Sequence, residues 1–286
     1  MSLWFIEEFA LGNAIQTQIQ IKTRLHTEQS KFQKIEVFDT TAFGRMLVID
    51  GAIMCTEYDE KAYHEMITHV PMFAHKDPKR VLIVGGGDGG TLREVVKHPQ
   101  LEQVDVCELD ERVVRVSQEF LPSMASQYNH PKLSLNFEDG IKWVKDHKGE
   151  YDVIIVDSTD PVGPGAILFT QEFFNYCYDA LNETGILVNQ AEDFHVERLV
   201  ILKRMLGYGE KFKVKSYYYT VVPTYPGGQI GFTFFSKKYL PFENFDERTN
   251  GDLTDFNFRY WTHQFHKAAF QLPRFAFQEL GIKSYS

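Results

Sequence analysis

The chain has 286 residues, of which 43% are hydrophobic, enough apolar material for a large buried core or for a domain with a smaller appendage. Its formal net charge of -9 argues against nucleic-acid binding, which needs an excess of clustered Lys and Arg, and favours a cationic small molecule. The chain has three cysteines, Cys55, Cys107 and Cys177. Their odd number and wide separation argue against a disulfide framework and a zinc site.

The beginning of the chain, "MSLWFIEEFA", is acidic and lacks the apolar run of a signal peptide. No later stretch approaches the roughly 20 apolar residues of a membrane-spanning helix. We therefore expect a protein of the reducing cytoplasm that has no membrane partner.

The pattern of apolar residues changes once along the chain. Residues 13–59 alternate polar and apolar side chains in short runs separated by turn signals, which predicts a small antiparallel sheet. The period becomes helical from Tyr63, in "YHEMITHVPMFAH". This change predicts an N-terminal β-strand domain at residues 1–60 and a second domain at residues 61–286.

From Arg80 onward, strands and helices alternate, as in "RVLIVGG", "TLREVVKH" and "QVDVCELD", and this predicts an α/β fold with a doubly wound parallel sheet. Two later runs, "KVKSYYYTVVP" and "QIGFTFFSKKY", are joined by "TYPGG" without a helix and predict an antiparallel edge. Residues 259–280 are aromatic-rich and are predicted to form packed helix, with rings in the core or at a subunit contact.

The stretch "VLIVGGGDGGTLREVV", residues 81–96, leads from an apolar strand through a glycine cluster into a helix. Gly85 to Gly90 satisfy G-x-G-x-x-G, the pattern of a nucleotide-binding turn. However, Asp88 lies inside the loop, close to where a dinucleotide would place its pyrophosphate. An acid at this place argues for a different ligand.

Further acids follow the next strand ends. Glu108 lies where an acid binds ribose hydroxyls, and Asp139, followed by Gly140, lies where an adenine edge is expected. Ligands of such folds bind beyond the carboxyl ends of the strands, so we expect these acids to converge on one crevice. The set is Asp88, Glu108, Asp139, Asp157 and Asp160. Taken singly, Asp139 or Asp160 could equally be a helix cap or a solvated turn residue.

Five stretches in chain order, "TEQSKFQ", "YHEM", "GGGDGG", "VDSTDPVGP" and "PTYPGGQIGF", resemble the spermidine synthase family of polyamine aminopropyltransferases. The resemblance covers nearly the whole chain. It implies a small N-terminal β-domain, a methyltransferase-like Rossmann domain and transfer of an aminopropyl group from decarboxylated S-adenosylmethionine to a diamine, with methylthioadenosine as by-product. The donor is a co-substrate, so no cofactor and no metal are implied.

The resemblance also implies roles for single residues. Asp157, the first acid of the D-S-[ST]-D-P motif, would accept a proton from the attacking amine, which has a pKa of roughly 10 and is unreactive while protonated. The donor and methylthioadenosine would contact Gln33, Asp88, Glu108, Asp139, Gly140 and Pro164. The amine would contact Tyr63, His64, Asp88, Asp157, Ser158, Thr159, Asp160, Gln190 and Tyr225.

Other activities fit parts of the pattern. An S-adenosylmethionine-dependent small-molecule N-methyltransferase of the same fold would have to accept the donor's carboxylate, which Asp88 opposes. An NAD-dependent oxidoreductase would need room for phosphates at the helix N-terminus. A nucleoside-binding relative without activity stays open as a third alternative.

The amine acceptor and the assembly are not determined by the sequence. Putrescine is favoured by its frequency in the family, but cadaverine, agmatine or a longer polyamine would suit the same acids and aromatic rings. After Gln190 the stretch "NQAEDFH" departs from the family's Gly-Glu pattern, so acceptor choice stays open. We expect a homodimer or homotetramer, because the N-terminal sheet has exposed apolar positions and the C-terminal region is aromatic-rich.

Overall fold

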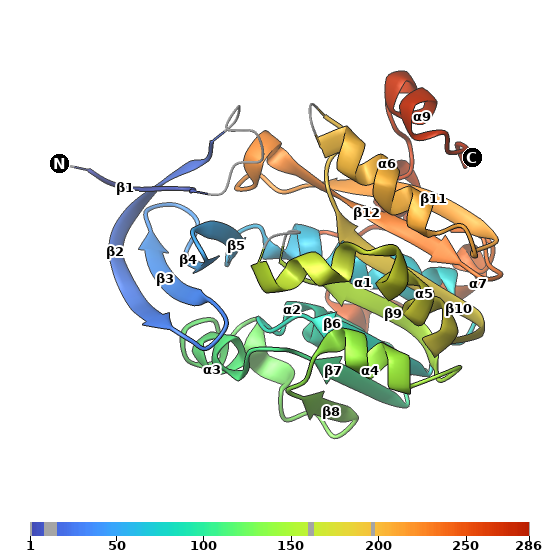
Figure 1. Cartoon of the computed structure of the whole chain (residues 1–286), viewed down its shortest axis with the longest axis horizontal. Helices are drawn as coiled ribbons and strands as arrows, with labels where there is room; N and C mark the ends of the chain where they lie inside the picture. Colours follow the sequence, from blue (N-terminus) through green and yellow to red (C-terminus); the bar gives the residue numbers. More distant parts are fainter. Residues whose placement is uncertain (1, 9–15, 160–162, 196–197, 286) are drawn as a thin grey trace.

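The computed structural model describes residues 2–8, 16–159, 163–195 and 198–285. A five-stranded antiparallel sheet, in the order β1-β2-β3-β4-β5, forms the N-terminal part of the molecule and curves beside the larger domain (Figure 1). Its strands are β1 (Leu3–Ile6), β2 (Gln18–Gln29), β3 (Lys34–Thr40), β4 (Arg45–Ile49) and β5 (Ala52–Thr56). The sheet predicted from the alternating runs is confirmed.

The sheet begins earlier than the alternating pattern indicated. Leu3 to Ile6 pair antiparallel with β2, in a register that places Leu3 opposite Ile21. The four residues of β1 are all apolar and therefore show no alternation that could mark them as a strand.

The second sheet has seven strands in the order β11-β12-β10-β9-β6-β7-β8. The strands are β6 (Arg80–Gly85), β7 (Gln103–Cys107), β8 (Leu133–Asn136), β9 (Tyr151–Asp157), β10 (Leu181–Ala191), β11 (Val214–Val221) and β12 (Gln229–Ser236). Strands β6 to β10 pair in parallel, whereas β12 is antiparallel to both β10 and β11. A mainly parallel Rossmann-like sheet with an antiparallel edge is thus confirmed.

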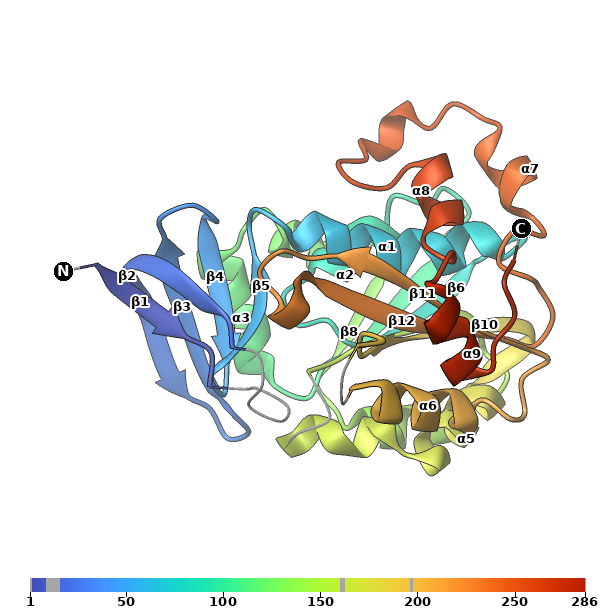
Figure 2. The same ribbon diagram turned by 90° about the horizontal axis from the view of Figure 1, so that it is seen from above.

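Helices cover both faces of this sheet (Figure 2). The helices are α1 (Glu60–Ala74), α2 (Gly90–Val95), α3 (Glu111–Phe120), α4 (Gly140–Asp146), α5 (Gln171–Ala180), α6 (Arg198–Tyr208), α7 (Phe245–Thr249), α8 (His263–Ala268) and α9 (Arg274–Leu280). Alternate residues of β9 enter different cores: Val153 and Ile155 pack on the α1 side, and Ile154 and Val156 pack on the α5 side. In the part of the chain that the structure describes, no helix is long and apolar enough to cross a membrane.

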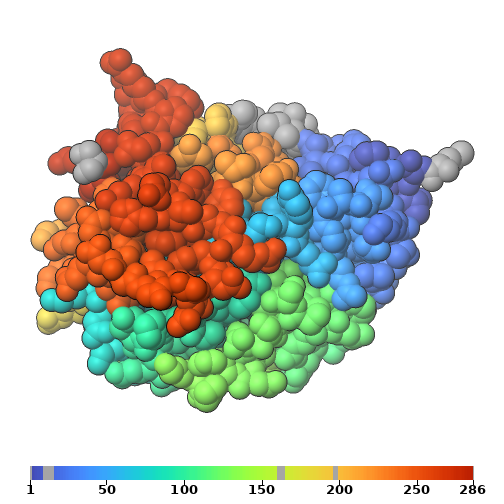
Figure 3. All heavy atoms as spheres, turned by 180° about the vertical axis from the view of Figure 1, so that it is seen from behind, coloured from blue at the N-terminus to red at the C-terminus, as the bar shows by residue number. Residues whose placement is uncertain are grey.

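The C-terminal region is more broken than the predicted packed helix. Residues 259–280 contain the two short helices α8 and α9, and α9 begins directly after Pro273, whose backbone has no N–H for a helix interior. The carboxylate of Glu65 on α1 accepts hydrogen bonds from three successive backbone N–H groups, those of residues 259–261, at 2.6–2.9 Å. Figure 3 shows the orange and red C-terminal segment spread over one face of the molecule.

Two features of the fold create a crevice. The chain reverses its direction of strand addition between β6 and β9, and ligands of open α/β sheets bind at such a switch point. Helix α3 packs through Val113 and Val116 against Val37 and Leu47 of the N-terminal sheet, which closes one side. The N-terminal sheet ends at Thr56, just before α1, and the division at residues 60 and 61 stays a prediction.

Candidate active site

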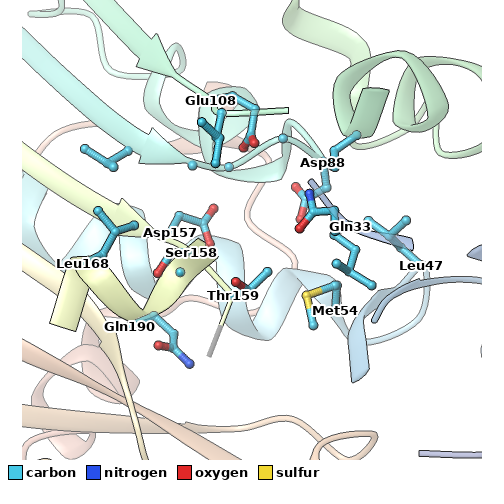
Figure 4. Close-up of a pocket in the computed structure, with 18 of the residues that line it drawn as sticks. Gln33, Leu47, Met54, Asp88, Glu108, Asp157, Ser158, Thr159, Leu168 and Gln190 are labelled. Atoms are coloured by element: carbon cyan, nitrogen blue, oxygen red, sulfur yellow. The ribbon is translucent and has the colours of Figure 1, made fainter. Parts of the chain in front are cut away.

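A cavity of about 300 Å³ lies at the carboxyl ends of β6 and β9, between the two sheets. Among its lining residues are the following predicted site residues: Gln33, Tyr63, His64, Asp88, Glu108, Asp139, Gly140, Asp157, Ser158, Thr159, Gln190 and Tyr225. Figure 4 shows Gln33, Asp88, Glu108 and Asp157 around this space. Asp160 and the side chain of Pro164, which are also predicted site residues, lie outside what the structure describes.

The glycine loop between β6 and α2 packs tightly against the end of β9. Gly85 has a φ of 85°, and a Cβ atom on it would lie 2.2 Å from the backbone oxygen of Asp157. The backbone N–H of Gly86 donates to that same oxygen at 2.7 Å. Gly85 is therefore required for a close approach between neighbouring strand ends.

Both carboxylate oxygens of Asp157 accept hydrogen bonds from hydroxyl groups. The Tyr63 hydroxyl donates to Oδ1 at 2.8 Å, and the Thr91 hydroxyl donates to Oδ2 at 2.6 Å. Burial raises the pKa of Asp157 above its ordinary value, and the charge of Asp88 raises it further, against the opposing effects of His64, Thr91 and Tyr63. A raised pKa makes this carboxylate a better proton acceptor than an exposed aspartate.

Asp88 begins a chain of buried charged groups. Its Oδ1 accepts the backbone N–H of Gly90 at 2.7 Å, and its Oδ2 lies 3.3 Å from Nε2 of His64. The other ring nitrogen of His64 lies 2.7 Å from Glu60, and Arg93 donates to Glu60 at 2.7 Å. Burial opposes a charge on His64, but Asp88 and Glu60 together raise the pKa of the imidazole well above its ordinary value. A raised pKa favours the doubly protonated ring, which can donate to both carboxylates.

Glu108 and Gln33 line the cavity near the end of β7, and both contact Asp110. The Glu108 carboxylate accepts the backbone N–H of Asp110 at 2.9 Å, and the Gln33 amide donates to the Asp110 carboxylate at 3.2 Å. Burial, together with the charges of Asp110, Asp157 and Asp88, raises the pKa of Glu108 to about 7. This site therefore exchanges a proton near neutral pH.

Asp139 is exposed, and its carboxylate accepts the backbone N–H of Ile141 at 2.8 Å, so it caps α4. The helix-cap interpretation is correct for this residue, although the residue also lines the cavity.

Two aromatic rings, those of Tyr63 and Tyr225, also line the cavity. Tyr63 and Tyr225 meet edge to face with ring centroids 6.3 Å apart. The Tyr225 hydroxyl donates to the backbone oxygen of Met54, which connects this turn to the N-terminal sheet. The Asp59 carboxylate accepts the backbone N–H and the hydroxyl of Thr224, so the turn that carries Tyr225 is held by the residue that precedes α1. Such a wall suits methylene groups and a cation together.

Sequence reasoning missed Glu7, a buried carboxylate directly after β1 that lines the cavity. Its Oε1 accepts the backbone N–H of Ile53 at 3.0 Å. The residue lies in a stretch without periodicity, and its only sequence signal is an acid next to an apolar run. Thr91 and Glu60 were also missed, because their contacts with site residues depend on how α1 and α2 pack. Among the described residues, no group of three or more His, Cys, Asp or Glu side chains is arranged to hold a metal ion.

Two family models match this chain: the spermine/spermidine synthase domain at residues 60–247 and the spermidine synthase tetramerisation domain at residues 3–57. The polyamine aminopropyltransferase of Leptospira biflexa is 42% identical over 276 residues, which cover 96% of this chain and 97% of that protein. The polyamine aminopropyltransferase of a Thermoanaerobacter species is 44% identical over 275 residues, which cover 96% of this chain and 97% of that protein.

Two solved structures are similar along almost the whole chain. A spermidine synthase in complex with the transition state analogue AdoDATO is 38% identical, with a TM-score of 0.91, and the match covers 98% of this chain and 95% of that chain. The spermidine synthase from Thermotoga maritima is 37% identical, with a TM-score of 0.89, and the match covers 98% of this chain and 94% of that chain.

Proposed function

This chain belongs to the spermine/spermidine synthase family and is a polyamine aminopropyltransferase, and we propose that its amine acceptor is putrescine, so that it forms spermidine. The family uses decarboxylated S-adenosylmethionine as co-substrate and releases methylthioadenosine. The choice of putrescine rests on its frequency in the family, and the observation that supports a cationic acceptor is the charge of the cavity. Asp88, Glu108, Asp139 and Asp157 line it, and no Lys or Arg occurs among the described lining residues. An acidic cavity suits two cationic substrates.

The reaction requires a proton acceptor and an orienting group. The amine nitrogen attacks the methylene carbon next to the sulfonium; a C–N bond forms while the C–S electron pair moves to sulfur, and the amine loses one proton. We propose that Asp157 accepts this proton. Its raised pKa and its two hydroxyl donors support the role, because they combine affinity for a proton with a fixed direction.

We propose that Asp88 binds the terminal ammonium of the donor's aminopropyl arm. S-adenosylmethionine carries an α-carboxylate on the same arm, which Asp88 would repel in a desolvated site. The imidazolium of His64 beneath Asp88 supports this assignment, because it helps to keep Asp88 ionised despite burial. Around the nucleoside we propose Gln33 and Glu108 as ligands, with Asp139, Gly140 and Pro164 near the adenine.

The acceptor is proposed to lie between the aromatic wall and the acids. Tyr63 and Tyr225 would flank its methylene groups, and the buried carboxylate of Glu7 supports a second cationic end. The proposed amine site also includes Ser158, Thr159, Asp160 and Gln190, with Asp160 assigned from the family resemblance alone. His64, whose ring nitrogens face Asp88 and Glu60, is proposed to act on the amine through Asp88.

The decisive experiment offers the protein each donor with each amine. We expect methylthioadenosine release from decarboxylated S-adenosylmethionine with putrescine, and spermidine as the amine product. Higher kcat/KM with cadaverine, agmatine or spermidine would overturn the choice of acceptor. Release of S-adenosylhomocysteine from S-adenosylmethionine would instead contradict the assigned role of Asp88.

The family's N-terminal model indicates a homo-oligomer, and we propose that the assembly is a tetramer. Strand β1 lies at the edge of its sheet and exposes Leu3, Trp4 and Ile6 by 58%, 53% and 46%. An exposed apolar edge strand is a ready contact for a second copy. We also propose a cytoplasmic location, which is supported by three free, buried cysteines.

A further inference from the structure

Thr91 lies in the glycine-loop sequence but is absent from the described lining of the cavity. It is the second residue of α2, its side chain is fully buried, and its hydroxyl donates to Oδ2 of Asp157 at 2.6 Å. The hydroxyl therefore reaches the carboxylate from behind the cavity wall. The hydrogen bond to Asp157, the proposed proton acceptor, explains why the Thr91 hydroxyl is buried, so no contact with a substrate is needed.

The glycine loop and its flanking helix hold Asp157 at several points. The Gly86 N–H holds the backbone oxygen, Thr91 holds Oδ2, and the Tyr63 hydroxyl from α1 holds Oδ1. A Cβ atom on Gly86 would lie 3.3 Å from Oδ2 of Asp157, closer than most real Cβ contacts. Glycine loops of this pattern commonly bind phosphate. Here the loop instead holds Asp157 at the end of β9.

We propose that Thr91 is a positioning residue for Asp157, which fixes the carboxylate plane through Oδ2 and stabilises its ionised form without adding charge. The inference rests on the proposed role of Asp157 as proton acceptor. A hydroxyl suits this position because a buried Lys or Arg would stabilise the carboxylate but would repel the cationic amine.

Several charged and titratable groups around Asp157 affect its pKa, and the Thr91 hydroxyl opposes those that raise it. Asp88 lies in the glycine loop, Tyr63 and His64 project from α1, and Glu108 follows β7. Burial and the charge of Asp88 raise the pKa of Asp157, whereas His64, Thr91 and Tyr63 lower it. Loss of the Thr91 hydroxyl therefore raises this pKa further. The carboxylate then becomes protonated at higher pH, and the acidic limb of kcat/KM moves upward.

The test compares Thr91→Val, which removes the hydroxyl but keeps the shape, with Thr91→Ser, which keeps the hydroxyl. For Thr91→Val we expect kcat to fall by about tenfold to a hundredfold, since a hydrogen bond to a charged group is lost. We expect its acidic limb of kcat/KM for the amine to rise by about one pH unit, with methylthioadenosine affinity within about twofold. The amine's own ionisation contributes equally to both profiles. Thr91→Ser should keep kcat within about threefold of that of the original enzyme, and its acidic limb should lie close to the original position.

Coincident pH profiles and turnover for Thr91→Val and the original enzyme would overturn the proposal. Equal losses in Thr91→Val and Thr91→Ser would also overturn it, because packing alone would then explain them. If Thr91→Val does not fold, Thr91→Ala is measured against Thr91→Ser with the same criteria.

Asp157→Asn separates this inference from the proposed function. Near-normal turnover of Asp157→Asn would refute the role of Asp157 itself. An inactive Asp157→Asn beside a normal Thr91→Val would refute only the role of Thr91.

Discussion

Nε2 of His64 lies 3.3 Å from Oδ2 of Asp88, so the acid in the glycine loop is paired with a buried imidazole whose pKa Asp88 and Glu60 raise well above its ordinary value. The same carboxylate accepts the backbone N–H of Gly90. Asp88 thus combines a structural hydrogen bond at the start of α2 with a charge at the cavity. These two roles can be separated by substitution.

Asp88→Asn should lose affinity for decarboxylated S-adenosylmethionine and should narrow the preference over S-adenosylmethionine. The reason is that the amide pairs less well with the donor's ammonium and no longer repels the parent compound's carboxylate. A difference of about 3 kcal/mol corresponds to discrimination on the order of a hundredfold. Calorimetric titration of both donors measures it. If the affinity for both donors fell equally, or if only the melting temperature fell, Asp88 would have no role in donor selectivity and only its structural hydrogen bond with Gly90 would remain.

Asp157→Asn should lower kcat by about two to four decades, the range of proton-transfer groups, because the amide cannot accept the amine's proton. Donor binding should change little, which titration with methylthioadenosine can establish. Steady-state rates with saturating amine give the main readout. Turnover close to that of the original enzyme would remove Asp157 from the proposed mechanism.

Methylthioadenosine should bind more tightly as pH rises through 7. The pKa of Glu108 is about 7 in the free protein, and ribose hydroxyls are better bound by its ionised form. Binding therefore releases a proton at lower pH, and affinity should increase about tenfold from pH 6 to pH 8. Calorimetry in buffers of different ionisation enthalpy counts the released proton.

Glu108→Gln is the matched variant for this pH dependence. It should weaken methylthioadenosine binding by about 1.5–3 kcal/mol at pH 8 and make the affinity nearly independent of pH between 6 and 8. If Glu108→Gln changed only the apparent affinity for the amine, the assignment of Glu108 as a ligand of the nucleoside would be wrong.

Glu60→Gln should destabilise the fold by about 3 kcal/mol, because it leaves Arg93 and the His64 imidazolium with one buried carboxylate fewer. Burial opposes its charge, but His64 and Arg93 hold the pKa of Glu60 below its ordinary value. A depressed carboxyl pKa stabilises the folded state above the unfolded-state pKa, so the contribution is present at pH 7 and is lost on acidification. Urea unfolding at fixed protein concentration measures it.

Glu111→Gln is the control for Glu60→Gln. Glu111 also pairs with an arginine, Arg115 on α3, but both side chains of this pair are half exposed. Its effect on unfolding should be much smaller. Equal effects of the two substitutions would show that the buried charges near His64 contribute no more than a surface pair.

Trp4→Glu should reduce the proposed tetramer to a smaller assembly, because it places a charge on the apolar edge strand β1. Sedimentation velocity at several protein concentrations resolves the species. Leu240→Glu is the control, since Leu240 is 45% exposed and follows β12 in the other domain. An unchanged tetramer in Trp4→Glu would exclude β1 from the interface.

The sequence alone determined the fold class and the acidic half of the cavity. Alternating runs identify strands because side chains on a strand face opposite sides, and the helix–strand alternation after residue 80 requires a mainly parallel sheet. Acids that follow parallel strands must lie at one edge, and this rule brought Asp88, Glu108, Asp139 and Asp157 to one cavity. Only local pattern and chain direction were needed for these inferences.

Tertiary structure decided what these acids contact and how they ionise. Glu7 reaches the cavity from the segment directly after β1, which has no periodicity, and Thr91 meets Asp157 only because α2 packs beside the end of β9. The pKa of about 7 for Glu108 results from burial next to other acids, whereas the raised pKa of His64 results from Asp88 and Glu60 acting against burial. Such contacts join residues that are distant along the chain, and desolvation depends on everything packed around a group, so no local sequence pattern encodes them.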